Sequence, residues 1–570
     1  MTTSVLSLLR KGALAGSVVL HHLGGDHASF AVQVTRRLGL ARRIPLGRGP
    51  IAWQVVAAHL ADQPLAVGGA ADQWAAGHPG AGLLDRLATS VVLHHGLDHL
   101  VPPRLMSGRM KALAALRRGS YQTALDELSE RSRLARTTRS ERLMMTPGVW
   151  PLLNGASSSS ARPFHPRPRT VVHALTSSLP HTVSGYTARS HSLMTAQREL
   201  GWRVEAVTRV GYPAAIGKLL AADLDVIDGI PMHRLQPSWL PLTLAARLRA
   251  QAQGLAAVVE QVRPQVLHTT TDHTNAIAVQ AVAHRFDLPW VYEMRGQLEL
   301  TWLASRPDRL REPARTSERM ALQRARETDA ARTADAVVVL SQVQKHELID
   351  RGVPADKITV APNAVSPSLL SHHTTPAEAR AHLGLPRQGH WVGTVSSLVD
   401  YEGLDTLLRA VARLRAEGRD IRCAIGGDGV SRPGLMALAR ELGINDQCLF
   451  PGRLARSAAV NWMAALDVVA VPRKDTPVCR VVTPLKPVEA LALNRPVIAS
   501  DLPALRELLE PTGNLLVTAE DDNAWARALT ESIDDRAAST ERAARGREWA
   551  AGRTWHSNAQ LYADLYDSLR

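Results

Sequence analysis

Short apolar runs alternate with amphipathic segments between residues 170 and 371, and this pattern predicts β-strands separated by α-helices. The run Thr170–Leu175 (TVVHAL) is predicted to be a short buried strand, followed by an amphipathic helix at Ser190–Leu200. Strands that are apolar on both faces and separated by helices are typical of a parallel sheet covered on both sides. Further strands are expected at Arg203–Val210, Pro264–His268, Trp290–Glu293, Ala336–Leu340 and Ile358–Val360.

The same alternation restarts after Pro386 and predicts a second sheet. Helices are expected at Leu404–Glu417 and Pro433–Leu442, and strands at His390–Thr394, Ile421–Ile425, Leu449–Phe450, Val468–Val471, Pro496–Ala499 and Asn514–Val517. The two series are joined near Val365–Ser371. We therefore predict two Rossmann-like domains, residues 170–371 and 372–550, and a final helix at 551–570 that crosses back to the first domain. Because ligands bind at the carboxyl ends of such sheets, the two domains should face each other across one cleft.

The first part of the chain has a different hydrophobic pattern. Residues 1–153 are predicted to be mainly helical, and Lys111–Glu130 has leucines and alanines at helical spacing, broken at Gly119-Ser120. This break favours a helix pair over a member of a helical repeat array, which needs neighbouring copies. Residues 154–169, with four consecutive serines and several prolines, are predicted to be a linker.

Charge is concentrated in this helical region. The chain of 570 residues has a formal net charge of +14, and residues 1–153 hold 18 Lys and Arg against 9 Asp and Glu. A basic surface of this kind suits an anionic membrane or a phosphorylated substrate, but a plain solvated helix surface explains it equally well. Aromatic residues make up 4% of the chain and no nucleic-acid-binding motif is present, so we expect no nucleic-acid partner.

Cysteine usage and the apolar runs indicate the compartment. The three cysteines are far apart and form no CxxC, which argues against a disulfide framework and a zinc site and fits a reducing cytoplasm. The apolar run Gly12–Leu20 is too short to span a membrane and precedes no cleavage signal. We expect a cytoplasmic protein, with peripheral contact at the inner membrane face left open.

Two segments in the second half carry candidate chemistry. Gly427-Asp428-Gly429 follows a predicted strand and precedes a helix, where glycines let backbone N–H groups approach an anion, although turn geometry alone also explains them. In Thr483–Glu507 a helix opens at Pro487 and carries Glu489 in its first turn. A carboxylate there can accept two hydroxyl hydrogen bonds, as a ribose requires, or can stabilise the helix dipole.

Seven motifs over some 400 residues resemble those of glycosyltransferase family 4, whose members are retaining enzymes with the GT-B fold. The resemblance is to the subset with YEGL and TPLKP motifs, and it covers residues from about 170 to 570. The motifs are Ser184-Gly185-Tyr186, Ala334-Asp335-Ala336 leading to Leu340-Ser341, Pro362-Asn363-Ala364-Val365, Tyr401-Glu402-Gly403-Leu404-Asp405, Gly426–Gly429, Phe450-Pro451-Gly452-Arg453 and PLKPVEA at 484–490.

The resemblance implies a nucleoside-diphosphate sugar held mainly by the second Rossmann-like domain. Glu489 would bind the ribose, the backbone near Gly452-Arg453 would lie by the base, and Gly185 would let the first loop approach the diphosphate. The acceptor would bind to the first domain, and the sugar would be transferred with retention while cations stabilise the leaving diphosphate. The resemblance also implies that transfer needs no metal and no cofactor.

The chain departs from the family pattern at the diphosphate. Ser397 and Glu402 stand where many relatives have an arginine and a lysine, and Val481 replaces a second glutamate. Lys486 and Arg480 are our candidates to supply the missing positive charge.

Candidates on the first domain come from two loops. His273, in the loop HTTTDHTN, is the preferred contact to the donor sugar, with His268 second. Arg295 is expected to bind phosphate or an acceptor carboxylate, or to pair with Glu293 or Glu299.

The resemblance, together with the basic N-terminal region, implies a hexosyltransferase that acts on a glycan or lipid-linked acceptor in cell-surface polysaccharide or glycolipid synthesis. Two alternatives stay open. One is a catalytically impaired pseudo-transferase that serves as a binding protein, and the other is a GT-B sugar-nucleotide epimerase. A Rossmann dehydrogenase is disfavoured, because no GxGxxG motif follows the first strand of either domain.

Overall fold

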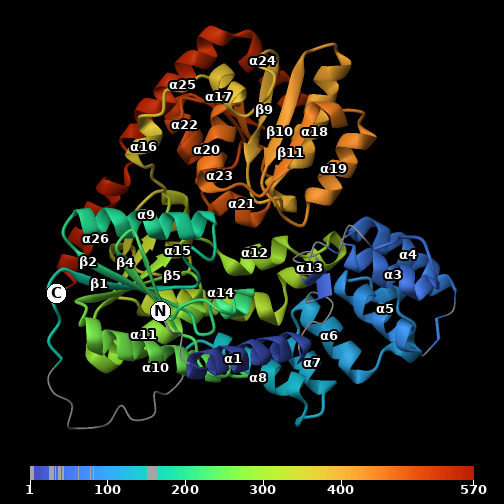
Figure 1. Cartoon of the computed structure of the whole chain (residues 1–570), viewed down its shortest axis with the longest axis vertical. Helices are drawn as coiled ribbons and strands as arrows, with labels where there is room; N and C mark the ends of the chain where they lie inside the picture. Colours follow the sequence, from blue (N-terminus) through green and yellow to red (C-terminus); the bar gives the residue numbers. More distant parts are fainter. Residues whose placement is uncertain are drawn as a thin grey trace.

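The computed structural model describes residues 5–24, 31–32, 34–35, 40, 44–61, 63–77, 79–80, 82–149 and 164–569. Two domains with central sheets lie one above the other, and a group of helices flanks the lower one (Figure 1). We call the lower sheet domain the N-domain, the upper one the C-domain and the flanking group, from α1 to α8, the helical region. Most of the expected linker, residues 154–163, lies outside the described residues.

The N-domain has an eight-stranded sheet in the order β3-β4-β2-β1-β5-β6-β7-β8. Its strand pairs are parallel except β3 with β4, an antiparallel hairpin at the edge of the sheet that the sequence pattern did not predict. The strands are β1 (Thr170–Leu175), β2 (Arg203–Thr208), β3 (Leu224–Ile227), β4 (Ile230–Arg234), β5 (Val266–Thr270), β6 (Trp290–Met294), β7 (Ala336–Val339) and β8 (Ile358–Val360).

Helices bury both faces of this sheet, which explains why most residues of its central strands are apolar whichever face they point to. One face packs against α10 (Leu244–Val262), α11 (His273–Phe286) and α14 (Glu318–Thr333). The other face packs against α9 (Gly185–Glu199) and the final helix α26 (Trp555–Ser568), whose Trp555, Tyr562 and Tyr566 are buried. Leu348 of α15 (Gln342–Asp350) also packs in the core on the first of these faces, and the remaining helices of the domain are α12 (Leu298–Ala304), α13 (Asp308–Arg315) and α16 (Pro367–Leu370).

The C-domain has a six-stranded parallel sheet in the order β11-β10-β9-β12-β13-β14. The strands are β9 (His390–Val395), β10 (Ile421–Gly426), β11 (Cys448–Gly452), β12 (Val468–Val471), β13 (Val497–Ser500) and β14 (Leu515–Val517). One face packs against α18 (Leu404–Ala416), α19 (Arg432–Glu441) and α24 (Asp522–Asp534). The other packs against α20 (Arg456–Ala464), α22 (Lys486–Ala492), α23 (Pro503–Leu509) and α25 (Arg536–Ala551). The short helices α17 (Pro376–His382) and α21 (Pro477–Val481) complete the domain.

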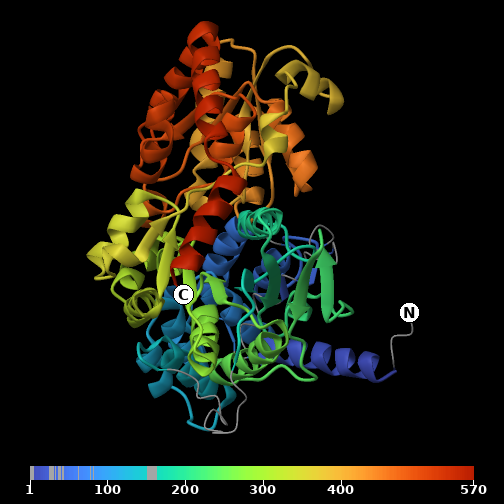
Figure 2. The ribbon, with the colours of Figure 1, turned by 90° about the vertical axis from the view of Figure 1, so that its left-hand side faces the viewer.

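The carboxyl ends of the two sheets face each other. The N–H groups of Gln342 and Val343, just after β7, donate to the carboxylate of Glu507 on α23 at 2.8 and 2.9 Å. Asn363, after β8, donates to the carbonyl of Thr483 at 3.1 Å. Figure 2 shows the end of the chain running down from the C-domain to the N-domain. Two sheets with opposed carboxyl edges are the GT-B arrangement predicted from the sequence.

The helical region has its own apolar core and is also docked on the N-domain. The core lies between α3 (Ile51–Leu60), α4 (Pro64–Ala76), α5 (Leu83–His94) and α6 (Gly108–Arg118). The predicted break falls at Gly119, which has φ 85° and separates α6 from α7 (Tyr121–Asp126). This left-handed conformation and the contact with Ser317 and Trp302 require a residue without a side chain.

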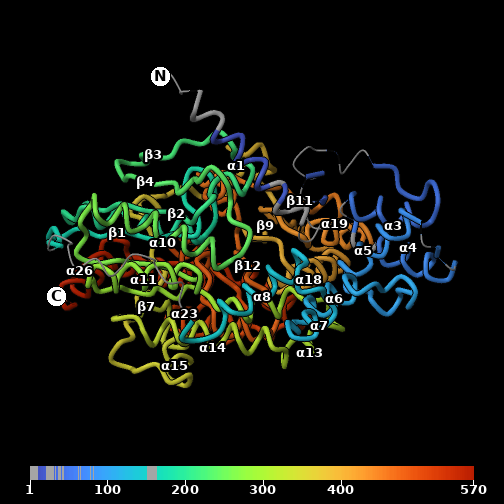
Figure 3. The backbone as a smooth tube through the Cα atoms, turned by 90° about the horizontal axis from the view of Figure 1, so that it is seen from below, coloured from blue at the N-terminus to red at the C-terminus, as the bar shows by residue number. Residues whose placement is uncertain are grey.

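Two helices anchor this region to the N-domain (Figure 3). The first, α8 (Arg133–Met145), packs on α10, and Arg142 forms an ion pair with Glu318 of α14. The second, α1 (Val5–Gly24), packs on the N-domain, and its Ser17 hydroxyl accepts the Leu240 N–H at 2.9 Å. Within the described part of the chain, no helix is both long and apolar enough to cross a membrane.

Candidate functional site

The topological switch point of the C-domain lies between β9 and β12, which are neighbours in the sheet. The loop after β9 begins with Ser396, and the loop after β12 contains Arg473. The connection after β9 leads to α18 on one face of the sheet and that after β12 leads to α22 on the other face, and open α/β sheets bind ligands at such a point. The candidate site is built around this point.

The glycine turn after β10 packs directly on the loop after β9. A Cβ atom on Gly427, which has φ 124°, would lie 1.8 Å from the Ser396 carbonyl oxygen, and one on Gly429 would lie 2.2 Å from that of Leu398. The Gly427 N–H donates to the Gly452 carbonyl at 2.8 Å. Gly427 is therefore required for backbone approach, and its N–H is already used within the protein. Asp428 is exposed, and its carboxylate accepts the Gly429 N–H at 3.0 Å.

Glu402, Lys486 and Arg473 form a buried charge cluster at the switch point. The Lys486 ammonium lies 3.0 Å from one Glu402 oxygen and also donates to the Ser396 hydroxyl, while the Arg473 guanidinium lies 3.0 Å from the other Glu402 oxygen. Burial disfavours the charge on Glu402, but Arg473 and Lys486 outweigh it and lower its pKa to about 2. Burial lowers the pKa of Lys486, and Glu402 offsets this in part. Two cations share one carboxylate, so the cluster carries an excess positive charge.

Glu489 lies three residues after Lys486 on α22, hence on the same face of that helix. Burial raises its pKa, and the positive charges of Arg456 and Lys486 oppose this rise. Lys486 links this helix to Ser396, and Ser396 touches the glycine turn. Lys486 therefore lies beside the loop that touches the Gly427–Gly429 turn, and Glu489 is one helical turn further along α22.

Gly452 ends the neighbouring strand β11, and Arg453 follows it. Gly452 has φ 81° and is buried, whereas Arg453 is exposed. The pairing of Gly452 with Gly426 places them beside the glycine turn, at the same edge of the sheet as Glu489.

The N-terminus of α9 supplies the opposite side of the site. Ser184 caps this helix by accepting the Thr187 N–H, and Gly185 is its first residue, with open space where a Cβ would be. Arg295 donates to the Tyr186 carbonyl at 2.9 Å and to the Ser190 hydroxyl at 2.6 Å, which fixes the first turn. Tyr186 is 49% exposed, and the charges of Arg295 in the N-domain and Arg473 in the C-domain both act on its hydroxyl, so the start of α9 is on the side of the N-domain that faces the C-domain. The positive end of the α9 dipole is therefore directed at this interface.

A buried network under α9 holds Arg295 in place. Glu293, which is fully buried, accepts from Arg189, Arg295, His268 and the Tyr562 hydroxyl. Burial alone would raise the pKa of Glu293, but the charges of Arg295 and Arg189 hold it well below its ordinary value. Of the alternatives for Arg295, pairing with Glu293 is the one observed. Its guanidinium is 3% exposed, so it positions the first turn of α9.

The two histidine candidates lie inside the N-domain. The His273 Nδ1 atom is 3.1 Å from the Glu327 carboxylate and the residue is 6% exposed, so any contact with a sugar would come from the other ring nitrogen, Nε2. His268 is fully buried and contacts the Tyr566 hydroxyl at 2.7 Å. Each histidine forms a hydrogen bond within the protein, and its contact with the donor sugar stays a prediction.

The placement of Arg480 corrects the sequence-based expectation. Its side chain is 55% exposed and forms a bidentate pair with Asp475, away from the charge cluster. A short helix, α21, turns Arg480 outward, whereas Arg473 precedes that helix and points at Glu402. Arg473 is the functional candidate that the sequence analysis missed. A second group it missed is a set of three histidines in the helical region, considered below.

Both sheet domains match family models of known proteins. Residues 184–364 match a family model described as glycosyl transferase 4-like domain, and residues 389–535 match one described as glycosyl transferases group 1. The 2-deoxystreptamine glucosyltransferase of Streptomyces kanamyceticus is 30% identical over 376 residues, 62% of this chain and 91% of that protein. The chain belongs to the family 4-like glycosyltransferases.

Other members of the family match a smaller part of the chain. A D-inositol 3-phosphate glycosyltransferase of Kineococcus radiotolerans is 28% identical over 304 residues, 50% of this chain and 67% of the relative. For another relative of that name the matched part is 54% of its length. Among solved structures, Anabaena HepE in complex with UDP-glucose superimposes with a TM-score of 0.55 at 18% identity and covers 70% of this chain and all of that one, which supports the GT-B fold.

Proposed function

We propose that this transferase moves a hexose unit from a nucleoside-diphosphate sugar to a glycan or lipid-linked acceptor, with retention of configuration. The C-domain holds the donor: Glu489 binds the ribose, and the base lies by Gly452 and Arg453. Lys486 and Arg473 face the diphosphate from the C-domain, and the N-terminus of α9 faces it from the N-domain. The departing phosphate oxygen takes the acceptor's proton, and these positive groups stabilise the charge that develops there.

One observation supports this proposal most: the cluster of Lys486, Arg473 and Glu402 lies at the switch point, opposite the start of α9. The family's usual cationic pair is missing from the sequence, and this absence favoured a pseudo-transferase. In the structure two cations share the Glu402 carboxylate, so positive charge remains for a diphosphate. The cluster therefore favours an active enzyme over an inactive binding protein.

Thermal shift and donor hydrolysis test the proposal together. UDP and UDP-glucose are expected to raise the melting temperature of the wild type, because a ligand selective for the folded state stabilises it. Glu489→Gln should weaken this shift, whereas Glu441→Gln, an exposed acid at the end of α19, should not. Glucose release from UDP-glucose should be measurable in the wild type. Binding without release, with or without added acceptor glycans, would instead support the pseudo-transferase.

A lipid-linked acceptor would place the enzyme at a membrane, and α5 offers a surface for that contact. Leu83 and Leu87 are 74% and 45% exposed, and Arg86 between them is also exposed. Apolar side chains beside a basic one are suited to the boundary of an anionic bilayer. The surface belongs to the helical region, whose sequence is markedly basic.

Vesicle flotation tests this membrane contact. Deleting residues 1–153 would uncover Leu248 and Ile277, which pack against Met144, so point substitutions are the cleaner test. The double substitution of Leu83 and Leu87 with serine should reduce flotation with phosphatidylglycerol vesicles. Leu220→Ser, at a leucine that is 75% exposed on the N-domain, is the matched control and should float like the wild type. Equal flotation of all three proteins would remove the membrane contact from the proposal.

A further inference from the structure

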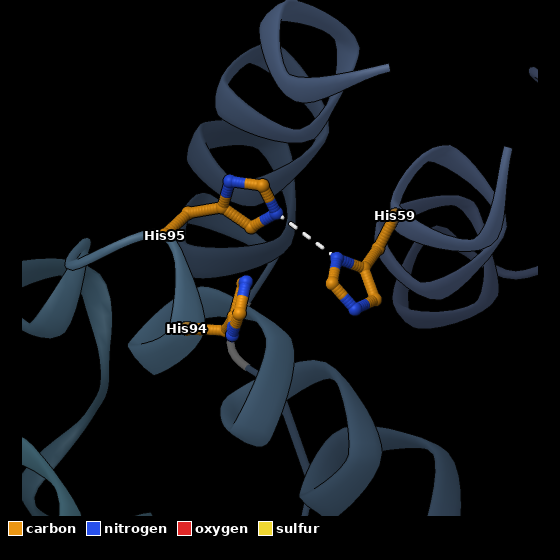
Figure 4. Close-up of side chains that lie close together, drawn as sticks. All are labelled: His59, His94 and His95. Carbon is orange, nitrogen blue, oxygen red and sulfur yellow. Dashed lines mark hydrogen bonds between the residues drawn. The ribbon is translucent and has the colours of Figure 1, made fainter. Parts of the chain in front are cut away.

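Three histidines from two helices of the helical region turn their rings toward one another (Figure 4). His59 lies near the end of α3, His94 is the last residue of α5, and His95 follows it. One ring nitrogen of each lies within 4.8 Å of those of the other two. The His59 Nδ1 and His95 Nε2 atoms are 3.0 Å apart.

The spacing of the rings matches a tris-imidazole metal site. Zinc–nitrogen bonds of about 2.0–2.1 Å in tetrahedral geometry place neighbouring ligand nitrogens about 3.3 Å apart and the ring centres about 5.2 Å apart. The three ring centres here are 5.0, 5.2 and 5.2 Å apart, with the rings steeply inclined to each other. Small side-chain rotations would bring all three nitrogens to bonding distance.

We propose that His59, His94 and His95 bind a divalent transition-metal ion of the Zn²⁺ type, with water in the fourth position. Imidazole nitrogen suits zinc, copper and nickel, and three neutral ligands suffice for a site that keeps one position open. His59 is 3% exposed, whereas His94 and His95 are partly exposed, so the ion would be held from the protein side and reached from solvent. The bound ion would tie α3 to α5 and stabilise the helical region.

Arg117 of α6 is a competitor within this site. Its guanidinium donates to His94 Nδ1 at 3.2 Å and also to the Leu93 carbonyl. A bound cation would compete with this hydrogen bond and be repelled by the guanidinium charge. Arg117→Met should therefore strengthen metal binding, an effect that a set of histidines held only by hydrogen bonds would not produce.

Cobalt titration tests the proposal directly, because four-coordinate Co²⁺ gives intense visible absorption bands. The untagged full chain, freed of metal by chelation, is expected to bind one Co²⁺ per chain with such bands, which added Zn²⁺ abolishes. His59→Gln and His95→Gln should each weaken binding on the order of 10-fold or more, since even indirect partners of a metal contribute that much. His346→Gln, at an exposed histidine of α15, is the matched control and should bind like the wild type.

The proposal is overturned if Co²⁺ does not bind saturably, or if both ligand variants bind as tightly as the wild type. Circular dichroism of each variant shows whether it folds. If the buried His59 variant does not fold, the partly exposed His95 variant decides the question by the same titration. An unchanged affinity in Arg117→Met would also contradict the predicted competition at His94.

Discussion

Replacing Glu402 with glutamine would remove the carboxylate that Lys486 and Arg473 share. Both cations would then stay at the switch point without their common counter-charge. The side chain of Glu402 is 8% exposed, so solvent screens these interactions weakly. We expect Glu402→Gln to destabilise the C-domain.

The size of the effect follows from the pKa of Glu402, which is about 2 in the folded protein against an ordinary value of 4.5. At 1.36 kcal/mol per pKa unit, the charged form contributes about 3 kcal/mol to the free energy of unfolding at pH 7. For a domain of this size that corresponds to a loss of about 6–12 °C in melting temperature. Because the folded pKa is depressed, the contribution is complete above pH 4.5 and declines as the pH falls toward 2. At pH 3 it should have dropped to about 1–2 kcal/mol.

Differential scanning calorimetry measures the difference in melting temperature between wild type and Glu402→Gln. The scans are run at pH 7 and at the lowest pH where both proteins fold reversibly. Glu417→Gln is the matched control, because its ion pair with Arg413 is more than half exposed and should change stability by less than about 0.5 kcal/mol. Equal melting temperatures for wild type and Glu402→Gln at pH 7 would refute the reasoning. A difference that grows as the pH falls would refute it as well.

Two further substitutions test the parts of the site that position these groups. Gly427→Ala should destabilise the C-domain by on the order of 3 kcal/mol, because φ is 124° at this position and the added Cβ would meet the Ser396 carbonyl. Gly434→Ala in α19 is the control: its Cβ would enter open space, and the substitution should stabilise the domain by about 0.5–1 kcal/mol. Urea unfolding followed by fluorescence compares the two, and a neutral Gly427→Ala would contradict the close approach. Glu293→Gln should lower the melting temperature and the transfer rate together, since it leaves buried arginines under α9 unpaired; an unchanged melting temperature would show that this network is not needed.

The sheets could be predicted from the sequence because their central strands are buried on both faces and are therefore mostly apolar. The hairpin β3–β4 could not, since Leu224 and Val226 are 48% and 61% exposed and its pattern is neither apolar nor regularly alternating. That Glu489 and the glycine turn lie at the same edge of the sheet was predictable for a topological reason. Both follow or flank parallel strands of one sheet, and the carboxyl ends of such strands share an edge.

The charges of the site were harder to predict because they depend on side-chain direction. Arg473 and Arg480 lie seven residues apart in a basic loop, and the sequence alone favoured Arg480. The fold selects Arg473, because α21 begins between them and turns Arg480 to solvent. The three histidines were missed for a related reason. His59 is remote in sequence from His94 and His95, and the packing of α3 on α5 brings them together.

The central claim is that the switch-point cluster binds a nucleoside diphosphate. Isothermal titration calorimetry with UDP tests it most directly, on the wild type, Lys486→Gln and Arg480→Gln. Lys486→Gln loses a charged hydrogen bond to the diphosphate, so its affinity for UDP should be about 10–100-fold lower than that of the wild type. Arg480→Gln removes the same charge from the surface pair with Asp475 and should bind UDP like the wild type. Equal affinity of the wild type and Lys486→Gln, or the absence of UDP binding by the wild type, would contradict the assignment.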